Sequence, residues 1–267
     1  MKSKEARTSE VGLAERVNIA GIGVDNLSEA EALGRVRLLI QAGGPHYAAV
    51  VNAAKVSLAR RDEELTRVLK SADLVTADGM SVVWASRLIG QRLKGRVTGI
   101  DLMCRIVEQA ERLDQSVYFL GACEESVRGA VEHFGSKCPR LRVAGYHNGY
   151  FSNRDSAAIA GDIRRSGADI LFVAMGSPAQ ENWIAANLAA TGIGFALGVG
   201  GSFDHVSGLV KRAPLWMQRA GMEWLFRLCS EPRRLWRRYL VGNSIFLWLV
   251  IKQVLSGDRN KLTAIDR

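Results

Sequence analysis

Hydrophobic and polar positions follow two alternating patterns along residues 17–210. Short apolar runs rich in β-branched residues are separated by longer stretches in which apolar positions recur every three or four residues. The first pattern predicts strands and the second predicts amphipathic helices, and their alternation is typical of an α/β fold with a mostly parallel sheet covered on both faces. The predicted strands are residues 17–21, 47–51, 74–76, 116–120, 141–144, 170–174 and 194–197. The predicted helices are residues 28–41, 54–71, 80–89, 98–113, 124–134, 154–165 and 178–190.

Two of these helices begin with recognisable capping residues. Ser177 precedes Pro178, and Gln180 follows three residues after the serine, which predicts Ser177 as the N-cap of the helix. Thr98 and Asp101 have the same spacing and predict a second capping box. After Gly208 the alternation stops, and two helical stretches, 214–230 and 233–255, follow on either side of a Glu-Pro pair.

Composition places the positive charge in one part of the chain. The 267 residues are 48% hydrophobic, which is enough for a large core and excludes a disordered or fibrous protein. The net charge is +9, from 36 basic and 27 acidic residues. Residues 211–267 have 12 basic and 4 acidic side chains and carry +8, whereas residues 1–210 have 24 and 23 and carry +1. The C-terminal segment is therefore the part expected to meet an anionic partner.

Several classes of protein are disfavoured by the remaining composition. The four cysteines and four histidines have no metal-ligand spacing, so we expect no structural metal site. The first 16 residues are polar and lack the apolar run of a signal peptide, so we expect a cytoplasmic protein. The longest uninterrupted apolar run, 245–251, is far shorter than the roughly 20 residues of a membrane-spanning helix. Attachment to a membrane surface remains compatible with the sequence.

The turns after the predicted strands contain the candidate chemical groups, because ligands of doubly wound sheets bind beyond the carboxyl ends of the strands. Asp78 either caps the following helix or acts as a functional carboxylate. Arg96 either clamps an anion or is solvated, and Asn52 and Gln180 have turn and capping explanations.

Three ligand-binding motifs are missing from the chain. It contains no G-x-G-x-x-G, no P-loop lysine motif and no D-x-D. A dinucleotide or nucleotide-hydrolysis site is therefore weakly supported. D-x-D is the carboxylate pair with which many nucleotide-sugar enzymes hold a divalent metal ion against the diphosphate. If this chain is a glycosyltransferase, arginines and helix N-termini must neutralise the leaving group instead.

Tryptophans and arginines interleave in the C-terminal helical stretches. This pattern suits a helix in the headgroup region of an anionic membrane, and it also fits a solvated basic edge or a nucleic-acid surface. The run 245–251 is too apolar for an ordinary solvated face and favours the membrane. The residues concerned are Trp216, Trp224, Trp236, Tyr239, Trp248, Arg227, Arg233, Arg234, Arg237 and Arg238.

Several segments together resemble, in their order, the WecG/TagA/CpsF glycosyltransferase family (glycosyltransferase family 26). They are DLVTADGM (73–80), RVTGIDL (96–102), GSPAQE (176–181), GVGGSFD (198–204), GMEWL (221–225) and EPRR (231–234). The resemblance extends from about residue 17 to residue 239. Several motifs in the same order are together far more specific than any single motif.

The resemblance implies an enzyme that transfers a sugar, with inversion, from a nucleotide-diphosphate sugar, usually UDP-linked, to a polyprenyl-diphosphate-linked saccharide. Such enzymes act at the cytoplasmic face of the membrane and build cell-surface polysaccharides. The family has a Rossmann-like body and a basic C-terminal appendage that touches the membrane and helps to close the active site. We therefore expect a flexible N-terminus (1–16), a catalytic domain (17–210) and a membrane-associating appendage (211–267).

Site residues follow from the resemblance position by position. Asp78 matches the catalytic base, which takes the proton from the acceptor hydroxyl. Asn52, Arg96 and Gln180 match positions that line the same pocket. The family often has threonine two residues before the asparagine, where this chain has Val50.

Three appendage arginines match residues thought to contact the diphosphate, namely Arg227, Arg234 and Arg237. We expect transfer without a metal ion or other cofactor and no nucleic-acid partner, while a homo-oligomer stays open. The alternatives are a nucleotide-dependent oxidoreductase on the same fold class and a nucleic-acid-binding protein that uses the basic tail.

Overall fold

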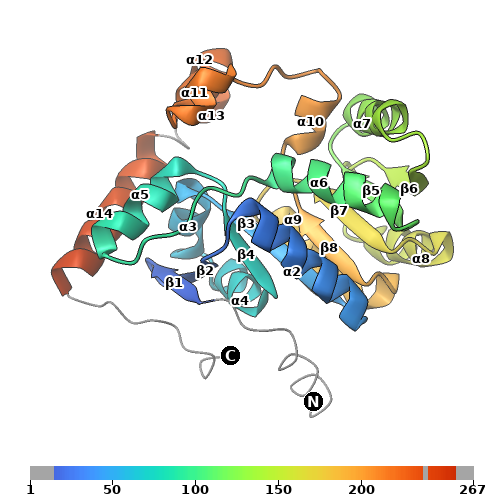
Figure 1. Ribbon diagram of the computed structural model, residues 1–267, viewed down its shortest axis with the longest axis horizontal. Helices are drawn as coiled ribbons and strands as arrows, with labels where there is room; N and C mark the ends of the chain where they lie inside the picture. The colour runs from blue at the N-terminus through green and yellow to red at the C-terminus, as the bar shows by residue number, and fades with distance from the viewer. Residues whose placement is uncertain (1–14, 237–239, 257–267) are drawn as a thin grey trace, which may run out of the picture.

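A parallel sheet of six strands lies at the centre of the protein (Figure 1). The computed structural model describes residues 15–236 and 240–256. From one edge of the sheet to the other, the strands are β4 (Leu74–Ala77), β3 (His46–Val51), β8 (Phe195–Gly198), β7 (Ile170–Ala174), β5 (Ser116–Gly121) and β6 (Arg142–His147). The α/β fold class is confirmed, and each of these strands coincides with a predicted one to within a few residues.

Helices cover both faces of the sheet. Because successive side chains of a strand point to opposite faces, Ala48 and Val50 of β3 pack in one layer and Ala49 and Val51 in the other. The first layer contains α2 (Glu29–Ala42), α6 (Gly99–Arg112), α7 (Glu124–Lys137) and α10 (Ser202–Val206). The second contains α3 (Ala53–Ala59), α4 (Glu63–Ser71), α5 (Met80–Ile89), α8 (Ser156–Ser166) and α9 (Ala179–Thr191).

The first predicted strand, 17–21, is not part of this sheet. It corresponds to β1 (Arg16–Ile19), which pairs antiparallel with β2 (Ile22–Asp25) in a separate two-stranded sheet. Ala20 and Gly21 have φ angles of 51° and 92°, and this left-handed pair reverses the chain within two residues. The prediction of a single strand here was wrong because its last two residues form the turn.

Two predicted helices are broken into shorter ones. The stretch 54–71 divides into α3 and α4 because the side chain of Asp62 accepts a hydrogen bond from Leu65 N–H at 2.9 Å and caps a new helix. The stretch 214–230 divides at Gly221, whose φ is +73°. The resulting helices are α11 (Leu215–Arg219) and α12 (Glu223–Ser230). The predicted stretch 233–255 contains α13 (Pro232–Trp236) and α14 (Gly242–Ser256), and residues 237–239 lie outside the described residues.

Helix α14 packs on the body, beside α3 and α5 (Figure 1). Phe246 and Val250 are buried in the core of the second layer. The Gln253 side chain accepts a hydrogen bond from Ala20 N–H at 2.8 Å and donates one to the Asn18 carbonyl at 2.9 Å. The division of the chain at residue 210 stays a prediction, and residues 1–14 of the expected flexible N-terminus lie outside the described residues.

Candidate active site

A cavity of about 410 Å³ lies between the carboxyl ends of β3 and β4 and the helices α5, α12 and α14. Its walls come from segments that are far apart in the sequence, including residues 52–54, 78–81 and 243–250. Four of the predicted site residues line this cavity, namely Asn52, Asp78, Arg96 and Arg227. The position agrees with the expectation that ligands bind where parallel strands end.

Asn52 and Asp78 are neighbours because they follow paired strands. Val51 pairs with Ala77 at the ends of β3 and β4, and Asp78 N–H donates to the Val51 carbonyl at 2.8 Å. Asn52 is the N-cap of α3, and its Oδ1 accepts from Lys55 N–H at 3.1 Å. Since the cap uses Oδ1, the amide Nδ2 is the atom with which Asn52 can donate to a ligand.

Asp78 does not cap α5. The N-cap of that helix is Gly79, with no side-chain cap hydrogen bond, so the capping explanation of Asp78 was wrong. Among the described residues, none forms a hydrogen bond or an ion pair with the Asp78 carboxylate. A half-buried carboxylate on a cavity wall can accept a proton or a hydrogen bond from a bound hydroxyl.

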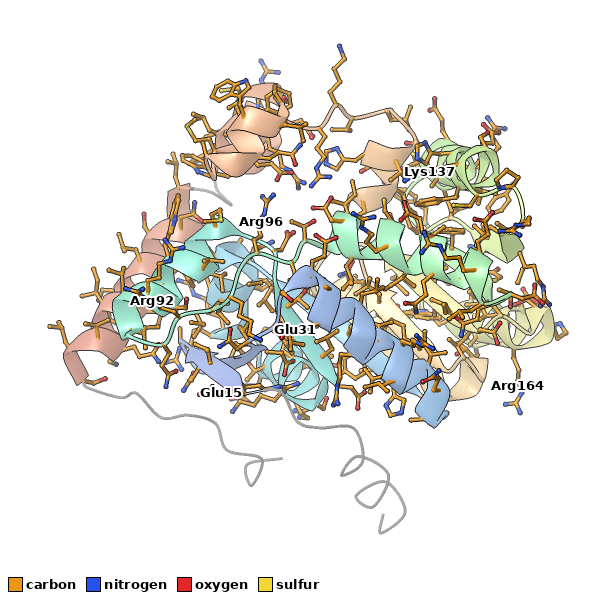
Figure 2. All side chains as sticks on the ribbon, in the orientation of Figure 1. Glu15, Glu31, Arg92, Arg96, Lys137 and Arg164 are labelled. Atoms are coloured by element: carbon orange, nitrogen blue, oxygen red, sulfur yellow. The ribbon has the colours of Figure 1, made fainter. Side chains whose placement is uncertain are left out.

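Arg96 reaches the same cavity from the α5–α6 connection, below α11–α13 in Figure 2. Its loop is attached to the sheet because Val97 N–H donates to the Ala77 carbonyl at 2.8 Å. Arg96 Nη1 donates to Glu223 Oε2 at 3.0 Å, and Arg227 Nη2 donates to Glu223 Oε1 at 3.3 Å. Each guanidinium has five N–H donors, so both keep donors for an anionic ligand.

A further ion pair joins Arg212 to Asp101 in the first turn of α6. Arg212 donates two hydrogen bonds to the Asp101 carboxylate, at 2.6 and 2.9 Å. Thr98 caps α6, as predicted, and its hydroxyl donates to Asp101 at 2.6 Å. Burial alone would raise the pKa of Asp101, but the hydrogen bonds from Arg212 and Thr98 outweigh it and hold the pKa below its ordinary value.

Gln180 is buried, with 1% of its surface exposed, and does not line the cavity. Its Nε2 donates to Glu181 Oε1 at 2.8 Å and its Oε1 accepts from Gly200 N–H at 2.9 Å. Lys55 Nζ lies 2.7 Å from the same Glu181 oxygen. Burial would raise the pKa of Glu181, but the charge and hydrogen bond of Lys55 lower it below the usual range. Gln180 thus supports the loop after β8.

The start of α9 also differs from the prediction. The helix begins at Ala179, its N-cap is Pro178, and no side chain caps it. The Ser177 hydroxyl donates instead to Glu181 Oε2 at 2.5 Å, so Ser177 belongs to the buried network around that carboxylate. The prediction of Ser177 as N-cap was wrong because this buried acceptor takes its hydroxyl.

Comparison with known proteins identifies the group to which this site belongs. The family model for the "Glycosyl transferase WecG/TagA/CpsF family" matches residues 17–260. The chain belongs to the WecG/TagA/CpsF glycosyltransferase family. It is therefore a glycosyltransferase, and family membership supports this activity over an oxidoreductase or a nucleic-acid-binding protein.

Three relatives of this family member carry the same name, N-acetylglucosaminyldiphosphoundecaprenol N-acetyl-beta-D-mannosaminyltransferase. The relative from Bacillus subtilis (strain 168) is 36% identical over 213 residues, which cover 80% of each chain. The relative from Bacillus spizizenii is 39% identical over 173 residues, covering 65% of this chain and 66% of the relative. The relative from Staphylococcus aureus (strain MW2) is 29% identical over 239 residues, covering 89% and 92%.

Two predicted site residues of this WecG/TagA/CpsF protein have no described side chain. Arg237 lies outside the described residues, and so does the side chain of Arg234, although its backbone is part of α13. Their roles stay predictions. Among the described residues, no helix has the length and apolarity needed to cross a bilayer.

Sequence reasoning missed two kinds of residue in the WecG/TagA/CpsF site. Glu223 belongs to the GMEWL segment, but nothing in the sequence indicated its role. Arg212 lies outside all of the motifs named above. The second kind is an apolar wall made by α5 and α14, with Trp84, Leu88 and Leu247. Its only sequence signal was the apolar run 245–251, which was interpreted as a membrane contact.

Proposed function

We propose that the protein transfers N-acetylmannosamine from a UDP-linked donor to N-acetylglucosaminyl-diphosphoundecaprenol or a closely similar polyprenyl-diphosphate saccharide, during assembly of a bacterial cell-surface polysaccharide. The names of three relatives support this choice of sugar and acceptor. The observation that carries the proposal is the cavity that brings the Asp78 carboxylate together with the Asn52 carboxamide and the guanidinium groups of Arg96 and Arg227.

Asp78 acts as the general base in this proposal. Its carboxylate takes the proton of the acceptor hydroxyl while that oxygen attacks the anomeric carbon, and the bond to the nucleotide diphosphate breaks on the opposite face of the sugar. The other carboxylate on the cavity wall among the described residues is Glu223, which forms ion pairs with arginines. Asp78 can therefore act as the base, and Glu223, held by arginines, is not available as a nucleophile. This supports a single displacement, which inverts the anomeric centre.

Arginines neutralise the leaving diphosphate. Arg96 and Arg227 lie on the cavity wall, and a guanidinium can bind phosphate oxygens through two parallel hydrogen bonds. Arg234 and Arg237, with undescribed side chains, add two more positive charges in the same C-terminal segment. This concentration of guanidinium groups supports transfer without a divalent metal ion.

Attachment to the inner face of the cytoplasmic membrane completes the proposal. Residues 211–267 carry a charge of +8, and exposed apolar side chains such as Trp216 and Trp248, 62% and 58% exposed, lie in the same segment. Basic residues and interfacial tryptophans together favour an anionic bilayer surface. The acceptor lipid would be met on that surface.

The test is a transfer assay with defined substrates. The full-length protein is incubated with a panel of UDP- and other nucleotide-linked sugars and with N-acetylglucosaminyl-diphosphate on a short prenyl chain. Mass spectrometry of the lipid product is expected to show addition of one N-acetylhexosamine from UDP-N-acetylmannosamine. A product with a different sugar would correct the donor, and no product with any donor would overturn the proposed function.

A further inference from the structure

The cavity has two chemically different ends. Asp78, Arg96 and Arg227 form a polar end that suits a sugar and a diphosphate. The other end, between α5 and α14, is apolar and is lined by Trp84, Leu88, Phe246, Leu247 and Val250. The base of a nucleotide sugar can stack on an aromatic side chain, but its sugars and diphosphate are polar and gain nothing from the aliphatic side chains Leu88, Leu247 and Val250. The apolar end therefore suits an apolar part of the substrates, which the nucleotide sugar does not supply.

The apolar wall contains both exposed and buried side chains. Phe246 and Val250 are 6% and 1% exposed and form the packed part of the wall. Trp84, Leu88 and Leu247 are 44%, 62% and 53% exposed, although each is a large apolar side chain on a helix that packs on the body. Exposed apolar side chains gathered beside a polar site are typical of a groove for an apolar ligand.

The apolar surface continues from the cavity along α14. Leu247, Ile251 and Leu255 are spaced by four residues and so lie on one side of the helix. They are 53%, 47% and 81% exposed. On α5, which lies beside α14 (Figure 1), Trp84 and Leu88 have the same spacing. An apolar path thus leads from the polar end of the cavity toward the exposed end of α14.

We propose that this path, defined here as the α5–α14 track, binds the first isoprene units of the acceptor's polyprenyl chain, next to the diphosphate. The proposal rests on the proposed function, in which the acceptor is a polyprenyl-diphosphate saccharide. A polyprenyl chain begins at the diphosphate, so an apolar subsite adjoining the arginines matches the order of groups in that lipid. Because the whole cavity holds only about 410 Å³, the track binds a short part of the chain and leaves the rest in the bilayer.

The test compares acceptors that differ only in chain length, in solution without lipid or detergent micelles. One acceptor carries N-acetylglucosaminyl-diphosphate on one isoprene unit and the other carries it on three. The variant L88Q/L247Q makes two exposed positions of the track polar, and glutamine is compatible with a helix, so the fold should persist. We expect the KM for the three-unit acceptor to rise about tenfold, from the loss of two apolar contacts. The kcat, and the KM values for the donor and the one-unit acceptor, should change less than about twofold.

Two control variants separate the track from other apolar surfaces. Leu38→Gln changes a leucine of α2 that is 47% exposed and does not line the cavity, and it should leave all KM values unchanged. Leu215→Gln changes a leucine of α11 that is 68% exposed and does not line the cavity, and it should weaken binding to anionic vesicles while leaving the KM for the soluble three-unit acceptor unchanged.

The outcomes distinguish the possible failures. Equal effects of L88Q/L247Q on both acceptors, or a loss confined to vesicle binding, would overturn the α5–α14 track as a prenyl subsite. The latter result would show that these side chains contact only the bilayer. Failure of the unmodified enzyme to use either acceptor would instead overturn the proposed function.

Discussion

Arg96 and Glu223 form an ion pair of 3.0 Å on the wall of the cavity, although they lie 127 positions apart in the chain. Glu223 also lies 3.3 Å from Arg227 and 3.8 Å from Arg212. One carboxylate therefore holds three guanidinium groups that would otherwise repel one another. This arrangement connects α12 to the loop that carries Arg96, and it positions the positive charge of the site.

Replacing Glu223 with glutamine tests this positioning role. Glutamine has nearly the same size but cannot neutralise the arginines, so we expect Arg96 and Arg227 to move apart. The kcat/KM should fall about tenfold, which corresponds to about 1.4 kcal/mol of transition-state stabilisation. Steady-state kinetics with both substrates measures the effect. Glu108→Gln, which removes the partner of two exposed cations, should leave kcat/KM unchanged. Faster transfer by Glu223→Gln would contradict the role, because it would mean that Glu223 competes with the diphosphate.

A triple alanine variant tests the diphosphate role of the C-terminal arginines, Arg227, Arg234 and Arg237. Each binds phosphate oxygens in the proposed mechanism, so transfer to a soluble short-chain acceptor, for which membrane attachment has no influence, should fall at least about 100-fold. The matched control removes three exposed basic residues from the body, Lys70, Arg128 and Arg165. Normal activity of the triple variant on the soluble acceptor would limit these arginines to membrane attachment.

Metal independence is tested by chelation. Because guanidinium groups neutralise the leaving diphosphate in this account, excess EDTA should change the rate of transfer by less than about twofold. The measurement is the initial rate in metal-free buffer with and without added Mg²⁺ or Mn²⁺. A complete loss that either ion restores would show that the arginines are secondary to a metal.

The Asp101–Arg212 pair predicts a pH-dependent contribution to stability. The folded pKa of Asp101 lies below its ordinary value of about 3.9, so the stabilisation is complete above that pH and disappears as the pH falls through the folded pKa. Asp101→Asn should lower the melting temperature at pH 7 by about 2 to 4 °C. Thermal unfolding of both proteins from pH 7 to pH 3 should show this difference shrinking below about pH 4. A constant difference over the whole range would contradict the charge pairing.

The central sheet was predictable because five of its strands, all except the edge strand β6, are largely buried and carry apolar runs. The hairpin at Ala20 and Gly21 was not, since one apolar run spans the first strand and the turn. The break between α3 and α4 had a local signal in Asp62, which precedes two glutamates. Because the residues on both sides of Asp62 have a helical pattern of apolar positions, the sequence predicted one continuous helix.

The candidate site was predictable only in part. Asn52 and Asp78 follow adjacent parallel strands, so strand order alone brings them together. Glu223 and Arg212 act through partners more than 100 residues away, and such pairs have no local pattern. The buried contacts of Phe246 and Val250 were also hidden, because a run of apolar residues on a helix fits a membrane surface as well as a core. Deleting α14 would therefore disturb the core, and exposed-residue variants are the better probes of membrane contact.

The most direct test of the account is the turnover of Asp78→Asn in the transfer assay. Asparagine keeps the size of the side chain but cannot accept the proton of the acceptor hydroxyl. Asp114→Asn, the same chemical change at a side chain that is 82% exposed and outside the cavity, is the matched control. We predict that kcat of Asp78→Asn falls about 10²- to 10⁴-fold, with the melting temperature and the donor KM nearly unchanged, while Asp114→Asn behaves as the unmodified enzyme. A kcat of Asp78→Asn within about threefold of the unmodified enzyme would contradict the assignment of Asp78 as the base.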